Sequence, residues 1–278
     1  MGMYRWLAIL ALSATSAHAA GDSIADAITH MYDFDFAGSH RILDQHIAAH
    51  PNDPLPYAFS ASAYLFSELD RLGILESEFL VDDDQIAAKK KRLDPDPETR
   101  RRFLAAVAAV ERRADVALKA NPNDKDALFA MCVAQGVSTD YMAFVEKRQI
   151  SSLSVARRSN GYAQRLLRLD PKFYDAYLTA GINEYLLGSL PFFVRWFVHF
   201  ENIDGNKQKG IDRLQLVSRD GVYFRPFAKI LLGIIALREK RPRDAQRLLA
   251  ELSHEYPQNP LFRNELAKIN ARIASSGN

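Results

Sequence analysis

A helical hairpin in residues 226–260 constrains the fold of this chain more than any other segment. Its first helix carries Gly233 and its second carries Ala245, and these small residues should let two antiparallel helices approach closely. Leucines at helical spacing fill the seam between the two helices, and Pro257 blocks further helix. Such a hairpin cannot bury its apolar face alone, so the sequence predicts that it stacks on similar hairpins.

Degenerate copies of this hairpin recur toward the N-terminus. The break between hairpins, a proline preceded by His, Asn or Asp, returns at residues 50–54, 121–124 and 170–171. After each break a new amphipathic helix begins, with small or apolar residues three and four positions apart on one face. The sequence therefore predicts an all-α chain of about five degenerate hairpins with inserted helices or loops, closed by a capping helix that begins near Leu261.

These motifs resemble the tetratricopeptide repeat family, and the resemblance covers nearly all of residues 21–278. The last third, from Gly188 through Pro191 and Tyr223 to Gly233, also looks like the tetratricopeptide repeat protein 39 and fungal inclusion-body-clearance family. The resemblance implies a right-handed α-solenoid whose first helices line a concave groove. It also implies an interaction protein rather than an enzyme.

Composition supports a single ordered domain and argues against a partner attracted by the net charge of the chain. The chain is 48% hydrophobic without a long low-complexity tract, so residues 21–278 are expected to form one helical repeat domain. The 36 Lys and Arg residues nearly cancel the 34 Asp and Glu residues. No global positive field would attract nucleic acid, and a nucleic-acid partner is not expected.

The N-terminal segment has the pattern of a secretory signal peptide. Arg5 precedes an apolar run over residues 6–12, and small residues follow at 17–20. We expect cleavage after Ala19 or Ala20, which leaves a soluble protein in the periplasm or cell envelope. The alternative is a retained anchor, although the run is shorter than the roughly 20 residues that span a bilayer. The cleaved protein could still contact a membrane surface, but we do not expect it to span the bilayer.

Catalytic and metal-binding patterns are weak. Cys132 is the only cysteine and lies in an apolar helix, where it is expected to be a buried small residue rather than a nucleophile. His46 and His50 lie one helical turn apart, but no glutamate base or third ligand accompanies them. The sequence therefore predicts no catalytic residues, no metal and no cofactor.

The first helices of the hairpins supply a predicted partner-binding groove. The resemblance places them on the concave side, where their side chains are apolar and lack the Lys, Arg and Asn residues that grip acidic peptide ends. An apolar groove fits an amphipathic helix or a hydrophobic segment, whereas the protein's own inserts are the alternative occupant. The predicted lining is Leu55, Ser62, Phe66, Phe129, Val133, Leu178, Ile182, Tyr185, Phe227, Ile230 and Ile234.

Three middle hairpins carry insertions of about 37, 15 and 17 residues between their helices. All three fall at the same turn, so they should emerge along one edge of the solenoid. The third insertion is strongly aromatic, and it either plugs the interior as core or acts as a wedge for a partner or lipid. Its key residues are Phe192, Phe193, Arg195, Trp196, Phe197, His199 and Phe200.

Together these patterns favour an exported, non-enzymatic scaffold or adaptor. Its partner would be a protein or peptide held in the apolar groove or at the inserted edge. The alternative is a carrier that shelters a lipid or another apolar small molecule.

Overall fold

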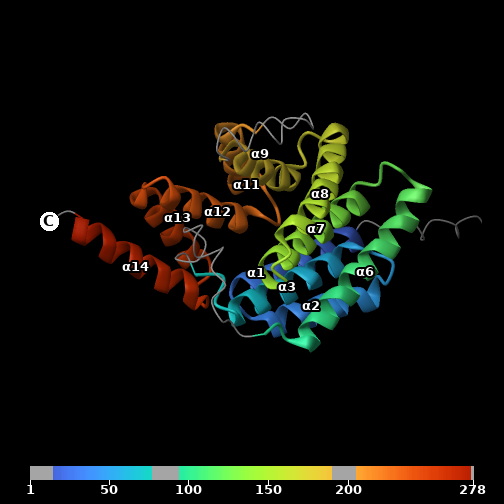
Figure 1. The fold of residues 1–278 in the computed structure, drawn as a ribbon. Helices are drawn as coiled ribbons and strands as arrows, with labels where there is room; N and C mark the ends of the chain where they lie inside the picture. The colour runs from blue at the N-terminus through green and yellow to red at the C-terminus, as the bar shows by residue number, and fades with distance from the viewer. Residues whose placement is uncertain (1–14, 77–93, 190–204, 277–278) are drawn as a thin grey trace, which may run out of the picture.

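The computed structural model describes residues 15–76, 94–189 and 205–276, and within these ranges the chain is helical without a strand (Figure 1). The all-α prediction is therefore confirmed for this part of the chain. The helices are α1 (Thr15–Tyr32), α2 (Phe36–Ala49), α3 (Leu55–Arg71), α6 (Pro97–Ala120), α7 (Lys125–Asp140), the π-helical turn η1 (Tyr141–Val145), α8 (Gln149–Leu169), the 3-10 turn η2 (Tyr174–Ala176), α9 (Tyr177–Ser189), α11 (Lys207–Asp220), α12 (Arg225–Arg238), α13 (Pro242–Glu255) and α14 (Pro260–Ser276).

Consecutive helices pack against one another in the order of the sequence. Each helix from α1 to α14 contacts the next described helix, and α3 additionally packs directly on α7. By contrast, α9 makes its main contacts with α8 and α11, and α12 makes its main contacts with α11 and α13. The final helix α14 packs on α13 and begins at Pro260, next to the expected start at Leu261.

Four of the turns that join consecutive helices share one geometry. Proline occupies the second position of each turn, where its fixed φ suits a type I β-turn, and the backbone N–H of the fourth residue donates to the carbonyl of the first. The proline breaks predicted at 50–54, 121–124 and 170–171 lie between helices, as does the one at Pro257. The four hydrogen bonds join Asp53 to His50 at 3.1 Å, Asp124 to Asn121 at 3.0 Å, Phe173 to Asp170 at 3.1 Å and Asn259 to Tyr256 at 3.2 Å.

Close helix approach depends on glycines other than Gly233. A Cβ on Gly233 would meet no atom within 4 Å, so the prediction that this glycine permits close packing is wrong. A Cβ on Gly210 would lie 2.5 Å from the backbone nitrogen of Tyr185, and one on Gly181 would lie 3.1 Å from the Gly210 carbonyl. The close approach is therefore between α9 and α11, while Ala245 is fully buried as expected.

The insertions partly lengthen helices. In the second insertion α7 continues into η1, and α8 has 21 residues where α13 has 14. In the first, Pro97 opens the 24-residue helix α6, and the Asp96 carboxylate accepts the N–H of Thr99 at 2.6 Å, as the sequence predicts for a helix cap. Residues 77–93 of the first insertion and 190–204 of the third lie outside the described residues.

The signal-peptide prediction falls largely outside the described residues, which begin at Thr15 within α1. Among the residues that are described, the segment Lys125–Val145 has the length and apolar composition of a membrane span. However, 61% of that window is buried inside the protein, because α7 lies against α3, α6 and α8. Burial of this kind is typical of the core helix of a folded domain.

The two ends of the helical array meet. The turn between α13 and α14 lies against the end of α1, 227 residues away along the chain (Figure 1). The buried Asn259 side chain donates from Nδ2 to the Tyr32 carbonyl at 2.6 Å, and the Gln258 N–H donates to the Asp33 carboxylate at 3.1 Å. The rings of Tyr32 and Tyr256 are 5.5 Å apart. The array therefore closes on itself.

Replacing Asn259 by alanine is expected to lower the free energy of unfolding by about 2 kcal/mol, because the side chain both joins α1 and caps α14 through the Leu261 N–H. Urea denaturation followed by circular dichroism measures this loss. The control is Asp124→Ala, which removes only a helix cap on Ala127 and should cost about 1 kcal/mol. Equal losses of unfolding free energy in the two variants would contradict a stabilising contact between α1 and the turn before α14.

Candidate binding recess

An aromatic cluster fills the space between the first halves of α3 and α7 and the start of α12. Phe59 of α3 lies 5.2 Å from the Tyr223 ring and 6.0 Å from the Phe224 ring. Phe129 of α7 lies 5.7 and 5.8 Å from the same two rings. Offset and tilted pairs at these distances stabilise a core beyond simple area burial. The space between α3, α7 and the start of α12 is thus filled by the protein's own residues.

A buried carboxylate holds the aromatic cluster in place. Asp175, in η2, accepts the backbone N–H groups of Val222, Tyr223 and Phe224 at 2.9, 3.0 and 2.7 Å. These donors lie in the turn that directly precedes α12, so the carboxylate ties this turn to η2, just before α9. Burial raises the pKa of Asp175, and the three N–H groups partly offset that effect.

The predicted groove residues divide into two groups. Leu55, Ser62, Phe129, Val133, Leu178 and Tyr185 are buried inside the protein and do not face solvent. Phe66, Ile182, Phe227, Ile230 and Ile234 are half-buried. Phe66 and Phe227 pack edge to face with their ring centroids 5.6 Å apart, so α3 and α12 meet across part of the expected groove.

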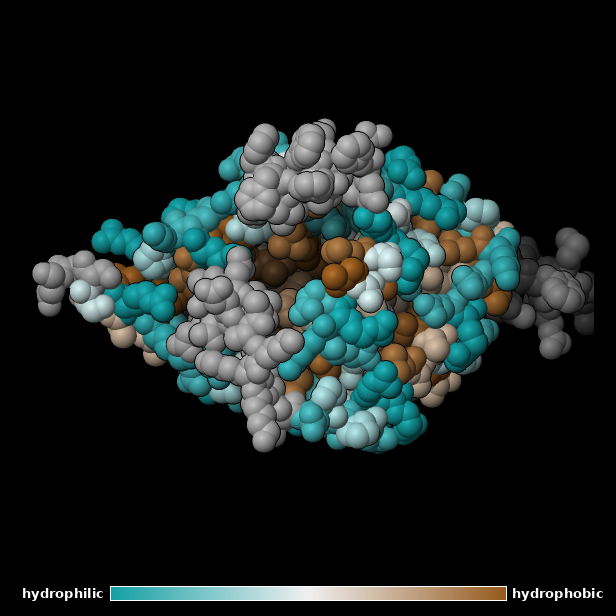
Figure 2. All heavy atoms as spheres, viewed as in Figure 1, coloured by the Kyte–Doolittle hydropathy of each residue, from teal (hydrophilic) through white to brown (hydrophobic). Residues whose placement is uncertain are grey.

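The apolar residues of α3, α9 and α12 that remain accessible to solvent are together called the apolar recess. Phe227 packs against both large apolar clusters of the protein, one of which includes Phe66 and the other Ile182. Figure 2 shows hydrophobic residues gathered in a hollow at the centre of this face. The recess exists because α9 and α12 pack mainly on their neighbours in sequence rather than on α7. Its apolar residues are Phe66, Ile182, Leu186, Phe227, Ile230 and Ile234.

Leu186 is the member of the recess that the sequence prediction missed. It is 57% exposed, although a leucine usually gains about 2 kcal/mol by burial. It follows Ile182 by four residues and therefore lies on the same face of α9. The prediction instead included the adjacent Tyr185, which is buried. Helical phase alone could have found Leu186.

One carboxylate lies on the same helical stripe as the groove residues of α7. Asp140 follows Val133 by seven residues, two turns along α7, and is half-buried. Within the described residues neither a hydrogen bond nor an ion pair reaches its side chain. Burial raises the pKa of Asp140 to about 7. The sequence did not mark this residue, because a single Asp at a helix end resembles any surface residue.

The position of Asp140 is fixed by the π-helical turn that follows it. The Tyr141 ring is buried and stacks on Phe103 of α6 at 4.4 Å, and Arg100 of α6 donates to Glu146 at 2.9 Å. Burial and the nearby Glu68 carboxylate raise the pKa of Tyr141 to about 12. Both ends of η1 are thus attached to α6, which is consistent with the frequent use of π-helical turns at functional sites.

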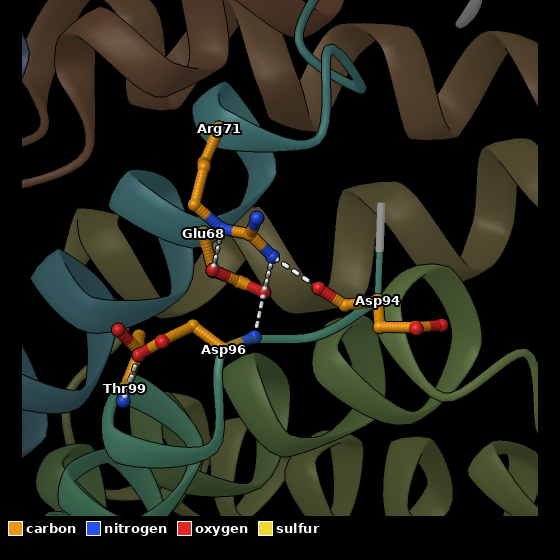
Figure 3. Close-up of polar contacts among 5 residues, drawn as sticks. All are labelled: Glu68, Arg71, Asp94, Asp96 and Thr99. Carbon is orange, nitrogen blue, oxygen red and sulfur yellow. Dashed lines mark hydrogen bonds and ion pairs between the residues drawn. The ribbon is translucent and has the colours of Figure 1, made fainter. Parts of the chain in front are cut away.

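Figure 3 shows the polar cluster that joins the end of α3 to the start of α6. The Glu68 side chain is 1% exposed and accepts two hydrogen bonds from Arg71 at 2.8 Å and the Asp96 N–H at 2.9 Å. Arg71 also donates to the Asp94 carbonyl. All of these hydrogen bonds join residues at the end of α3 to the segment that leads into α6. A bidentate Glu–Arg pair whose carboxylate also accepts a backbone N–H is typical of a structural link between two helices.

The other candidate sites contribute little. His46 is buried and lies 3.1 Å from the Asp53 carboxylate, and its ring is 5.0 Å from that of His50. Among the residues that the structure describes, no three His, Cys, Asp or Glu side chains could hold a metal ion. Cys132 is buried, and burial raises the pKa of its thiol. The predicted aromatic insert, Phe192 to Phe200, lies outside the described residues. The predicted roles of Arg195, Trp196 and His199 therefore stay predictions.

Comparison of the chain with models of protein families, with curated proteins and with solved structures finds no match. Function is therefore inferred from the recess itself.

Proposed function

We propose that this protein is a non-enzymatic scaffold or adaptor of the tetratricopeptide type, exported to the periplasm or cell envelope, which binds a protein or peptide partner in the apolar recess. The observation that carries the proposal is a hollow lined with hydrophobic residues on one face of the protein (Figure 2), and α3, α9 and α12 hold large apolar side chains that remain in contact with solvent. Concave apolar surfaces of this kind are preferred places for a ligand.

The same proposal interprets the helices as five degenerate hairpins stacked in a right-handed solenoid. The pairs would be α1–α2, α3–α6, α7–α8, α9–α11 and α12–α13, with α14 as the cap. The repeated proline turn and the packing of neighbours in sequence order support this division. In such a solenoid α3, α9 and α12 are first helices, and the inserted edge offers additional contact area to a partner.

Leu186→Arg is expected to reduce partner binding at least about tenfold, because a charged side chain replaces an apolar one in the recess. The measurement compares wild-type and variant proteins purified gently from the envelope fraction of the host and analysed by native mass spectrometry. Leu186 is 57% exposed, so the fold should tolerate the change.

The matched control is Leu153→Arg on α8, at a residue that is 58% exposed and outside the recess. A partner in fixed ratio should accompany the wild type and Leu153→Arg but not Leu186→Arg. Equal recovery with all three proteins would contradict binding in the recess. Release of lipid on denaturation, without a protein partner, would instead establish the alternative, a carrier of an apolar molecule.

A further inference from the structure

One side of α8 presents an exposed stripe that combines apolar and cationic side chains. The buried side of this helix packs on α7, its main neighbour. On the opposite side, Ile150 is 87% exposed and Leu153 is 58% exposed. Arg157 and Arg168 follow Ile150 by about two and five helical turns, so they point the same way, and both are exposed. We call Ile150, Leu153, Arg157 and Arg168 the outer stripe of α8.

The outer stripe belongs to a cationic part of the chain. The 21 residues of α8 include four arginines and neither an aspartate nor a glutamate, and Lys147 and Arg148 directly precede them. Glu146, before the helix, pairs with Arg148 at 3.3 Å and with an arginine of α6 at 2.9 Å. Asp170, after the helix, pairs with Lys125 at 3.0 Å. The carboxylates at both ends of α8 are thus already paired.

The acidic residues of the adjacent α6 lie beside α8 and not on the outer stripe. Burial, and then the Asp115 carboxylate, raise the pKa of Tyr162 of α8, and the Glu111 carboxylate has a smaller effect in the same direction. Tyr162 is half-buried and lies about a third of a turn around α8 from Ile150. Glu111 also accepts a hydrogen bond from Gln135 of α7 at 3.0 Å. The exposed side chains of the stripe are therefore apolar or positively charged.

We propose that the outer stripe of α8 docks on the surface of an anionic phospholipid bilayer. This proposal assigns a second surface and does not depend on what the apolar recess binds. Ile150 and Leu153 enter the boundary of the acyl chains, and the cations of the same stripe contact phosphate groups, as in a basic amphipathic helix at a membrane interface. A protein partner is disfavoured at this surface, because the stripe lacks the aromatic anchors that dominate protein interfaces.

The test is co-sedimentation of the full mature chain with two kinds of vesicle, phosphatidylcholine alone and phosphatidylcholine mixed with phosphatidylglycerol. The wild type should bind the mixed vesicles at least about tenfold more tightly, and added salt should weaken this binding. Ile150→Glu should reduce binding to the mixed vesicles about tenfold, because a charged side chain no longer enters the acyl boundary. Ile150 is 87% exposed, so the fold should tolerate the change.

A charge variant tests the cations of the stripe. Lys147→Gln combined with Arg168→Gln should reduce the preference for phosphatidylglycerol several-fold and leave binding to phosphatidylcholine unchanged. An unchanged preference in this double variant would overturn a contact between these cations and lipid phosphate.

Leu186→Glu is the comparison that separates the outer stripe from the recess. It adds the same charge as Ile150→Glu, at a residue of the recess that is 57% exposed, and it should bind the mixed vesicles as the wild type does. Loss of vesicle binding in Leu186→Glu but not in Ile150→Glu would assign the lipid to the recess and overturn the proposal. Equal binding of the wild type to both kinds of vesicle, or no binding at all, would also overturn it. Failure of the proposed function is a separate result, the absence of a protein partner from the wild type.

Discussion

Replacing Asp175 by alanine is expected to lower the free energy of unfolding by about 3 kcal/mol, the largest stability effect that the structure predicts. The substitution removes the acceptor of three backbone N–H groups in the turn that precedes α12. It also detaches Tyr223 and Phe224, whose rings pack on Phe59 and Phe129. Urea denaturation, with an unchanged slope against denaturant, measures the loss.

Asp220→Ala is the matched control for this prediction. Asp220 lies at the end of α11 and forms an ion pair with the adjacent, exposed Arg219. Surface pairs of this kind contribute little, so the control should change the unfolding free energy by less than about 0.5 kcal/mol. A loss in Asp175→Ala as small as that of the control would show that the carboxylate does not hold α12.

Asp140→Asn is expected to raise the free energy of unfolding by about 2 kcal/mol at pH 8 and to leave it nearly unchanged at pH 4. Burial raises the folded-state pKa of Asp140 from 3.8 to about 7. The folded state therefore binds this proton more tightly than the unfolded state. The stabilisation is complete below about pH 4, falls as the pH rises through 7, and the cost stays constant above that pH.

The measurement is the difference in unfolding free energy between the wild type and Asp140→Asn across pH 4–8, which cancels the titration of the other groups. Asp115→Asn serves as a control at an exposed position and should give a difference that does not change with pH. If the difference in unfolding free energy for Asp140→Asn also did not change with pH, the ionised Asp140 carboxylate would not destabilise the folded protein.

Much of the local structure was predictable from the sequence. Proline fixes the turns at residues 50–53, 121–124 and 256–259, so the helix starts near Leu55, Lys125 and Pro260 follow from the positions of these breaks. Asp96 and Pro97 predicted the start of α6 in the same way. These features depend on short-range physics, where backbone restriction and capping act within a few residues.

The groove was less predictable, because its shape depends on contacts between distant residues. The resemblance to tetratricopeptide repeats placed Phe129 and Val133 on the concave side, but Phe129 is covered by Tyr223 and Phe224, which Asp175 holds in position. Contacts of this length carry no periodic signal in a single sequence. The prediction that Gly233 allows close helix packing failed for the same reason. A small residue in the sequence does not reveal whether another helix lies close to it.

Site-specific photo-crosslinking tests the central claim, that the recess binds a protein segment, most directly. A benzoylphenylalanine residue would replace Leu186 in the recess and, in a separate control, Leu153 on α8. The proteins would be irradiated in the envelope of the host and analysed by mass spectrometry. The account predicts a crosslinked protein partner from position 186 and none from position 153. A lipid adduct at 186, or the same protein adducts from both positions, would contradict it.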